Sequence, residues 1–147
     1  MLNIKIKYFD KELEHVKEIA EGDWIDLRCS ENITLKKGDF KLIPLGVAME
    51  LPNGFEAHLT SRSSMCKKFG IFHCDDLGII DNSYCGDNDQ WFLPVIAVRD
   101  TEIQKNDRIC QFRLQKTMRG EYGPVKFTTV EQLNNPDRGG IGSTGTK

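Results

Sequence analysis

The segment "LGIIDNSYCGD", residues 77–87, carries a carboxylate and a phenol at the lip of a predicted tight hairpin. An apolar pair precedes Asp81, and Tyr84 follows it three residues later. Between them, Asn82 and Ser83 are residue types that favour turns. A carboxylate and a phenol held this close together at a turn mark the segment as a place where chemistry could occur.

The segment "SRSSMCKK" offers a binding site for an anion. Ser63 and Ser64 lie at the predicted start of a short helix, with Arg62 beside them, and together they present hydroxyls, helix N–H groups and a guanidinium. The alternative is that the serines only cap the helix.

A second anion site is predicted near the C-terminus, in "RGGIGSTGTK". Glycines allow consecutive backbone N–H groups to converge on an anion, and Arg138, directly before Gly139 and Gly140, adds a fixed positive fork. The alternative is a disordered, solubilising tail.

Two further predicted strands carry polar side chains. Asp26, in "GDWIDLR", has apolar neighbours on both sides and should point to solvent, with Trp24 on the same face. In "KNDRICQF", Asp107 and Arg108 are expected to form a turn and an ion pair, and Gln111 lies on the face opposite Cys110.

Short alternating segments separated by polar turns indicate an all-β barrel or sandwich. The predicted strands are "NIKIKYF", "NITL", "FKLIPLGVAMEL", "FEAHL", "QWFLPVIAV", "DRICQFRL" and "PVKFTTV". Residues 10–23 could form a helical turn or be irregular, and a short helix within 61–71 should stop at Gly70.

Composition places the chain among ordinary globular proteins. It has 147 residues, 39% of them hydrophobic and 29% charged, with a net charge of -2. This size predicts a single domain, and the charge disfavours binding to duplex nucleic acid. No apolar run approaches eighteen residues, and the five cysteines form no C-x-x-C pair, so we expect a cytoplasmic protein with reduced thiols.

The order of these motifs along the chain resembles that of the trimeric deoxyuridine triphosphatases (dUTPases), most closely those of Gram-positive bacteria and their phages. The resemblance runs from about Gly22 to Gly145 through Asp26, "SRSS", "GIIDNSYCGD", "DRICQF" and "RGGIGSTG". It implies a jelly-roll fold (a distorted β-barrel) with one short helix, comprising residues 1–133, and a mobile, glycine-rich C-terminal arm, residues 134–147.

The implied reaction is hydrolysis of dUTP to dUMP and pyrophosphate with Mg²⁺. The implied assembly is a homotrimer whose sites are shared between subunits and closed by the arm. A phage-derived chain of this family would have a host regulatory protein as a further partner.

The resemblance also implies residue roles. Asp81 is the general base, Gly78 and Ile80 belong to the hairpin whose main chain reads uracil, and Tyr84 packs against the sugar. The remaining substrate-binding residues contact the phosphates or close the site: Arg62, Ser63, Ser64, Gln111, Arg138, Gly139, Gly140, Ile141 and Ser143. Asp26 is an outer-shell partner of the magnesium ion.

Three positions depart from the family pattern. Ser83 replaces a second acid, Cys85 replaces a basic residue, and Ile141 replaces an aromatic residue that stacks on uracil in many relatives. We therefore consider Trp91 or Phe92 as a substitute lid, although at least one of these rings is expected in the core.

Two other functions remain open. The dCTP deaminases share this fold, but they need a glutamate ten residues beyond the hairpin aspartate, where this chain has Trp91. The second alternative is a regulatory binding protein that is switched by bound dUTP.

Overall fold

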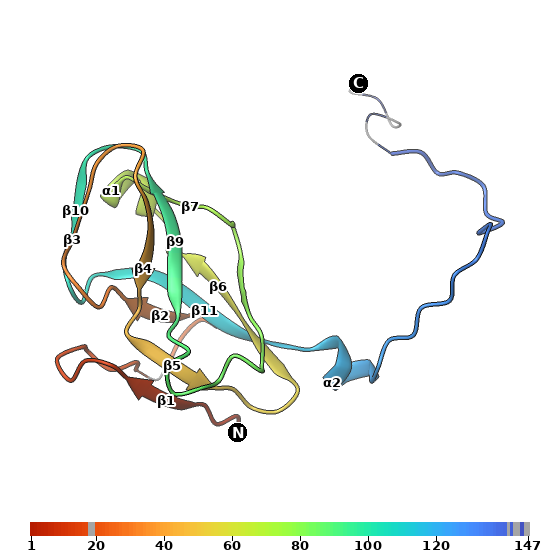
Figure 1. Ribbon diagram of the computed structural model, residues 1–147, viewed down its shortest axis with the longest axis horizontal. Coiled ribbons are helices and arrows are strands. Elements are labelled where there is room, and N and C mark those ends of the chain that lie inside the picture. Colours follow the sequence, from red (N-terminus) through yellow and green to blue (C-terminus); the bar gives the residue numbers. More distant parts are fainter. Residues whose placement is uncertain (18–19, 141, 143–144, 146–147) are drawn as a thin grey trace.

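The computed structural model describes residues 1–17, 20–140, 142 and 145. The strands are β1 (Lys5–Tyr8), β2 (Ile25–Arg28), β3 (Ile33–Leu35), β4 (Phe40–Pro44), β5 (Val47–Glu50), β6 (Phe55–Ser61), β7 (Ile71–His73), β8 (Gly78–Ile80), β9 (Phe92–Ala97), β10 (Thr101–Ile103) and β11 (Arg108–Lys116). Two short helices complete the fold, α1 (Met65–Phe69) and α2 (Met118–Tyr122) (Figure 1).

The strands form four antiparallel sheets. The largest has the order β2-β11-β6-β8, and the second has the order β4-β9-β7. The pairs β1-β5 and β10-β3 complete the arrangement. The all-β jelly-roll prediction is confirmed, although no sheet closes into a barrel among the described residues.

The core lies between these sheets. Alternate residues of β9 and β11 point inward, because successive side chains of a strand lie on opposite faces. Trp91 and Phe112 meet edge to face at its centre, with ring centroids 5.2 Å apart. Both side chains are fully buried, as are Ile43, Leu59 and Leu93.

Helix α1 ends as predicted, but its start differs from a capped helix. Gly70 stops it in the left-handed conformation, at φ 60°. Ser64 also has a left-handed backbone, at φ 67°, and its side chain makes no capping hydrogen bond. Capping by Ser64 is therefore not observed, and its hydroxyl is not used by the helix.

Two segments differ from the sequence prediction. Helix α2 was not predicted, whereas residues 10–17 are irregular, which is one of the two alternatives left open for residues 10–23. The hydroxyl of Thr117 caps α2 by accepting the N–H of Gly120 at 2.9 Å. The predicted strand 124–130 is also absent, because the chain runs away from the sheets after α2 and no strand lies beside it (Figure 1).

Residues 124–133, which the sequence prediction placed in the domain, thus belong to an exposed segment that leads into the arm. Its apolar side chains are exposed: Val125, Phe127, Val130 and Leu133. In the described part of the chain, no helix has the length and hydrophobicity to cross a membrane.

Candidate active site

Asp81 lies directly after β8, at the start of a tight turn. The N–H of Tyr84 donates to the carbonyl of Asp81 at 3.0 Å and closes this turn. The hydroxyl of Ser83 and its backbone N–H, the latter at 2.8 Å, both donate to Oδ1 of Asp81. Both bonds lower the pKa of the exposed Asp81 carboxyl below its ordinary value, and the bond from the Ser83 hydroxyl contributes more than the bond from the backbone N–H. Asp81 is therefore ionised at neutral pH and can accept a proton.

The predicted hairpin is wrong in its pairing. β8 pairs with β6, with Gly78 opposite Leu59 and Ile80 opposite Ala57. The strand that follows the turn, β9, pairs with β4 and β7 in another sheet. Asp81 and Tyr84 thus lie where the chain crosses between two sheets.

The turn is attached to its surroundings by two residues whose roles the sequence did not reveal. Nδ2 of Asn82 donates to the carbonyls of Pro52 and Phe55, at 2.9 and 2.7 Å. The hydroxyl of Tyr84 donates to the carbonyl of Gln90 at 2.8 Å. The sequence indicated only that Asn82 favours a turn. It did not predict that the side chain donates to the carbonyls of Pro52 and Phe55, which are distant in the sequence.

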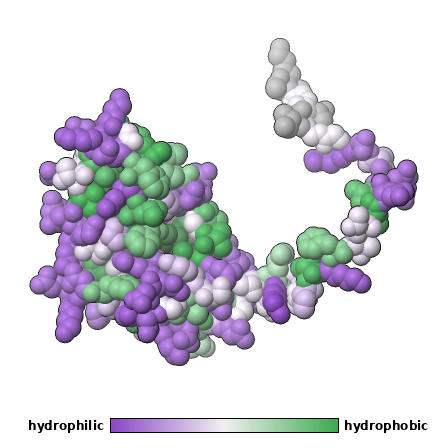
Figure 2. All heavy atoms as spheres, viewed as in Figure 1, coloured by the Kyte–Doolittle hydropathy of each residue, from purple (hydrophilic) through white to green (hydrophobic). Residues whose placement is uncertain are grey.

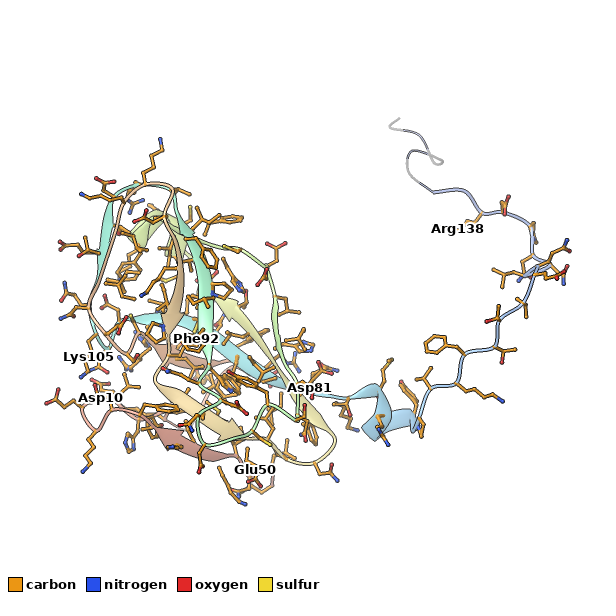
Figure 3. All side chains as sticks on the ribbon, in the orientation of Figure 1. Asp10, Glu50, Asp81, Phe92, Lys105 and Arg138 are labelled. Atoms are coloured by element: carbon orange, nitrogen blue, oxygen red, sulfur yellow. The ribbon has the colours of Figure 1, made fainter. Side chains whose placement is uncertain are left out.

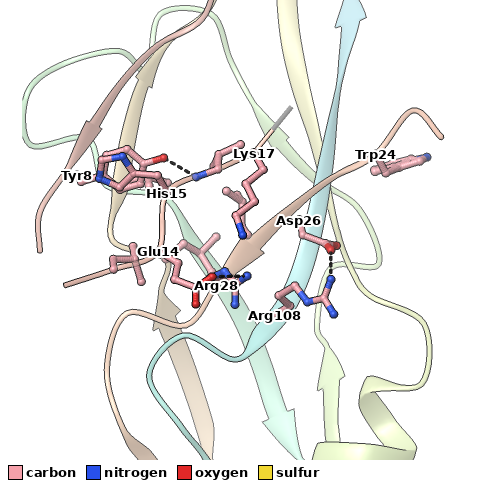
Figure 4. A pocket seen from close by; sticks show the side chains of 13 residues that line it. Tyr8, Glu14, His15, Lys17, Trp24, Asp26, Arg28 and Arg108 are labelled. Atoms are coloured by element: carbon pink, nitrogen blue, oxygen red, sulfur yellow. Dashed lines mark hydrogen bonds and ion pairs between the residues drawn. The ribbon is translucent and has the colours of Figure 1, made fainter. Parts of the chain in front are cut away.

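A second cluster forms around Asp26. Its Oδ1 lies 2.9 Å from Nε of Arg62. Figure 4 shows the second pair, in which Oδ2 of Asp26 lies 3.2 Å from Nη1 of Arg108. Arg108 thus pairs with Asp26, while Asp107 accepts the N–H of Gln104 within a turn. The expectation of an Asp107–Arg108 ion pair is wrong, because β11 places Arg108 beside β2.

Gln111 belongs to the same face of the sheet. It pairs with Asp26 on β2 and with Thr60 on β6, and residues directly opposite one another on neighbouring strands have side chains on one face. The half-buried Gln111 and the fully buried Cys110 point to opposite sides, as predicted. The sheet thereby brings Asp26, Arg62 and Gln111 together.

Ser63 and Ser64 lie beside this cluster, at the end of β6. With Arg62 they line a pocket of about 350 Å³, which is also lined by His73 and Asp76. The left-handed backbone of Ser64 is strained for a residue with a side chain, and such strain clusters at ligand sites.

One chain does not bring all the predicted site residues together. Ile80 pairs with Ala57 on β6, five residues before Arg62, which directly follows this strand. At about 3.3 Å per residue, Arg62 lies roughly 16 Å along the strand from the turn of Asp81. Arg138 lies on the C-terminal arm, well away from Asp81 (Figure 3). Gly139 and Gly140 follow it directly in the sequence, and Ile141 and Ser143 lie outside the described residues.

Of the two rings considered as a lid, Trp91 is excluded by its position. Its side chain is 0% exposed and packs on Phe112, so its ring cannot cover a ligand. Phe92 is half-buried and lines a pocket of about 320 Å³ together with Asp81 and Tyr84. A lid role for Phe92 stays a prediction.

The cysteines offer neither disulfides nor a metal site in the described residues, which include all five. Burial raises the pKa of Cys29 to about 11, and burial also raises the pKa of Cys110 well above its ordinary value. Both are protonated thiols at neutral pH and poor nucleophiles.

Comparison with known proteins shows the family. A family model described as dUTPase matches residues 24–145, most of the chain. The chain belongs to the dUTPase family. A dUTPase relative from Bacillus subtilis (strain 168), the SPbeta prophage-derived deoxyuridine 5'-triphosphate nucleotidohydrolase, is 54% identical over 146 residues, which cover 99% of this chain and 100% of the relative.

Solved dUTPase structures share the fold. The Staphylococcus bacteriophage 80alpha dUTPase with dUPNHPP has a TM-score of 0.79 at 18% identity, covering 98% of this chain and 99% of that one. It is described as controlling transfer of virulence genes by a G protein-like mechanism. A mutant dUTPase of phage phi11 of S. aureus, described with a structural Mg(II) ion, has a TM-score of 0.74 at 15% identity, covering 90% and 99%.

Among the described residues, those around Asp26 do not enclose a metal site by themselves. Both carboxylate oxygens of Asp26 are already bonded to guanidinium groups. No group of three acidic, histidine or cysteine side chains among the described residues could enclose a metal ion. Mg²⁺ keeps several waters and binds phosphate oxygens readily, so Asp26 suits contact through a metal-bound water.

Proposed function

We propose that the protein is a dUTP diphosphatase that hydrolyses dUTP to dUMP and pyrophosphate. The observation that carries this proposal is the 54% identity, over nearly the whole chain, with a deoxyuridine 5'-triphosphate nucleotidohydrolase. The structure supports it by holding Asp81 exposed and ionised on a closed turn. Such an enzyme limits the dUTP available for incorporation into DNA and supplies dUMP for thymidylate synthesis.

In the proposed reaction, Asp81 acts as the general base. Its carboxylate takes a proton from a water molecule, whose oxygen forms a bond to the α-phosphorus. The bond from that phosphorus to the α–β bridging oxygen breaks, and pyrophosphate leaves with the electron pair. The main chain of Gly78 to Ile80 reads uracil, and the ring of Tyr84, 39% exposed, packs against deoxyribose.

The phosphates require positive charge and N–H donors, because phosphoryl transfer depends on positioning and charge neutralisation. We assign the α and β phosphates to Arg62, Ser63 and Ser64, with Gln111 beside them. We assign the γ end to Arg138 and the glycine-rich segment after it. Bound Mg²⁺ would neutralise phosphate charge, with Asp26 holding one of its waters.

We further propose that the sites form between subunits of a homotrimer. The roughly 16 Å between Ile80 and Arg62 along β6 separates the base from the proposed phosphate site within one chain. A second copy can place its Asp81 beside this chain's Arg62.

The sheet β4-β9-β7 has exposed apolar side chains that another subunit would bury, and Figure 2 shows hydrophobic surface over β4 and β9. They are Phe40, Leu42, Phe72 and Ile96.

Deamination is not favoured by the structure. The position where a dCTP deaminase needs its glutamate is Trp91, which is fully buried and has no group that exchanges a proton. A regulatory role switched by dUTP stays a hypothesis. It is motivated by the phage 80alpha protein, which is described as controlling transfer of virulence genes by a G protein-like mechanism.

The proposal is tested by comparing dUTP, dTTP, UTP and dCTP in a pH-indicator hydrolysis assay with Mg²⁺. We expect proton release with dUTP alone, because only that nucleotide combines an unmethylated uracil with a deoxyribose. Ammonia release from dCTP would instead identify a deaminase. Hydrolysis of all four nucleotides would contradict a site that reads the base.

The pH dependence of the reaction is predicted by the Ser83–Asp81 contact. The base works when it is ionised, so activity falls as the pH drops through the pKa of Asp81. Removing the hydroxyl in Ser83→Ala raises that pKa toward the ordinary carboxyl value, and the acid limb of kcat/KM moves to higher pH. Ser83→Thr keeps a hydroxyl and should keep the wild-type limb; an unmoved limb in Ser83→Ala would contradict the prediction.

A further inference from the structure

The turn that carries Asp81 has few attachments to the rest of the molecule. β8 spans three residues at the edge of its sheet, and Ile79 within it is 54% exposed. Among the described residues, the hydrogen bonds that join residues 81–84 to other parts of the chain come from the side chains of Asn82 and Tyr84. The position of the carboxylate therefore depends on very few contacts.

Asn82 makes the stronger of these attachments. A side-chain amide has two N–H donors, and both are matched by carbonyls, those of Pro52 at 2.9 Å and Phe55 at 2.7 Å. The side chain is half-buried against the 52–55 turn. Because its donors are used inside the chain, Asn82 acts through the turn and does not donate to a nucleotide.

The surface that receives Asn82 is itself rigid. The N–H of Phe55 donates to the carbonyl of Pro52 at 3.1 Å, and Gly54 supplies the positive φ that this turn requires. Pro52 has a fixed φ, and Phe55 is the first residue of β6, which lies between β11 and β8. The 52–55 turn is thus a firm reference point for Asp81.

The same turn also holds the root of the C-terminal segment. The carbonyl of Gly54 accepts the backbone N–H of Thr117 at 2.9 Å and its hydroxyl at 3.3 Å. Gly120 packs so closely that a Cβ on it would lie 2.8 Å from Cα of Gly54. The 52–55 turn therefore contacts both the turn that carries Asp81, through Asn82, and the start of α2, through Thr117. The chain that follows α2 leads to Arg138.

We infer that Asn82 is a positioning residue for the reaction: its amide clamps the Asp81 turn onto the 52–55 turn and so fixes the general base relative to the bound nucleotide. This inference rests on the proposed function. A displacement of about 1 Å in a reacting group can lower a rate about 10²-fold. Loss of the clamp should therefore affect the chemical step more than binding, since Tyr84 keeps its own bond to Gln90.

The experiment compares three variants with wild type for kcat, KM and thermal unfolding. Asn82→Ala should lower kcat for dUTP about 10²-fold and change the affinity for dUPNHPP much less. Asn82→Asp keeps the shape of the side chain but places a carboxylate, which cannot donate, against the carbonyls of Pro52 and Phe55. Protonation of the new carboxyl gives it one O–H donor, so the kcat of this variant relative to wild type should rise as the pH falls. Asn53→Ala, on the same turn with an exposed side chain, should match wild type.

Hydrogen exchange gives a readout that is independent of activity. In Asn82→Ala, the amides of Ser83 and Tyr84, which bond to Asp81, should exchange faster, while those of β11 should not change. A wild-type kcat in Asn82→Ala, or equal losses in kcat and in dUPNHPP affinity, would overturn the inference. If the wild-type protein does not hydrolyse dUTP, the proposed function fails. The clamp is tested separately by hydrogen exchange: unchanged exchange at residues 83–84 in Asn82→Ala would refute it.

Discussion

Replacing Asp81 with asparagine is expected to lower kcat for dUTP hydrolysis about 10³-fold, within the range that general-base catalysis contributes. Asparagine has the same shape, and its Oδ1 can still accept the two hydrogen bonds from Ser83. It cannot take a proton from water at neutral pH. The measurement is steady-state hydrolysis of dUTP at saturating Mg²⁺.

The control for this variant is its folding and its binding. Asp81 is exposed, so the melting temperature should stay near that of wild type, and dUPNHPP should bind with similar affinity. Activity within tenfold of wild type would show that another group activates the water.

The same variant tests whether sites are shared. Asp81→Asn and Arg62→Ala should each have strongly reduced activity alone, but co-expression of the two chains should restore part of the wild-type activity. A mixed oligomer then contains a site that combines an intact Asp81 from one chain with an intact Arg62 from another. No restoration in co-purified mixed oligomers would place both residues in a site made by one chain.

Replacing Trp91 with alanine is expected to lower the free energy of unfolding by about 3–5 kcal/mol. The ring is fully buried and meets Phe112 at 82°, so its removal leaves a large cavity at the centre of the core. No hydrogen bond of its indole N–H is lost, because that group has no partner among the described residues. Urea unfolding followed by circular dichroism measures the change.

Phe92→Ala is the matched comparison. Because Phe92 is only half-buried, Phe92→Ala should lower the free energy of unfolding less than Trp91→Ala does. Weaker binding of dUPNHPP to Phe92→Ala would support a lid role for Phe92. A loss below about 1 kcal/mol for Trp91→Ala would contradict a core position, since truncation of a buried aromatic residue costs several times more.

Elements that depend on local chemistry could be predicted from the amino-acid sequence. Period-two alternation located most strands, because burial of one sheet face imposes it directly. Gly70 identified the end of α1, because a left-handed position favours glycine. The order of the motifs also indicated the family, which the family model and the prophage relative then showed.

The packing of the whole chain decided which segments pair as strands and which side chains enter the core. "PVKFTTV" alternates like a true strand, yet residues 124–130 have no strand beside them and none forms. Trp91 and Phe92 are neighbours in sequence, but the pleat sends Trp91 into the core and leaves Phe92 near Asp81. Periodicity assigns a residue to a face, but it does not say what that face meets.

The same limit applies to the site. Asp26 meets Arg62 and Arg108, and Asn82 meets the 52–55 turn, through contacts that span 27 or more residues of sequence. The pairing of distant strands brings these side chains within reach of one another, and it also separates Asp81 from Arg62 along the direction of β6. The chemistry of each side chain is local and readable from the sequence, whereas its partners are set by the packing of strands distant in the chain.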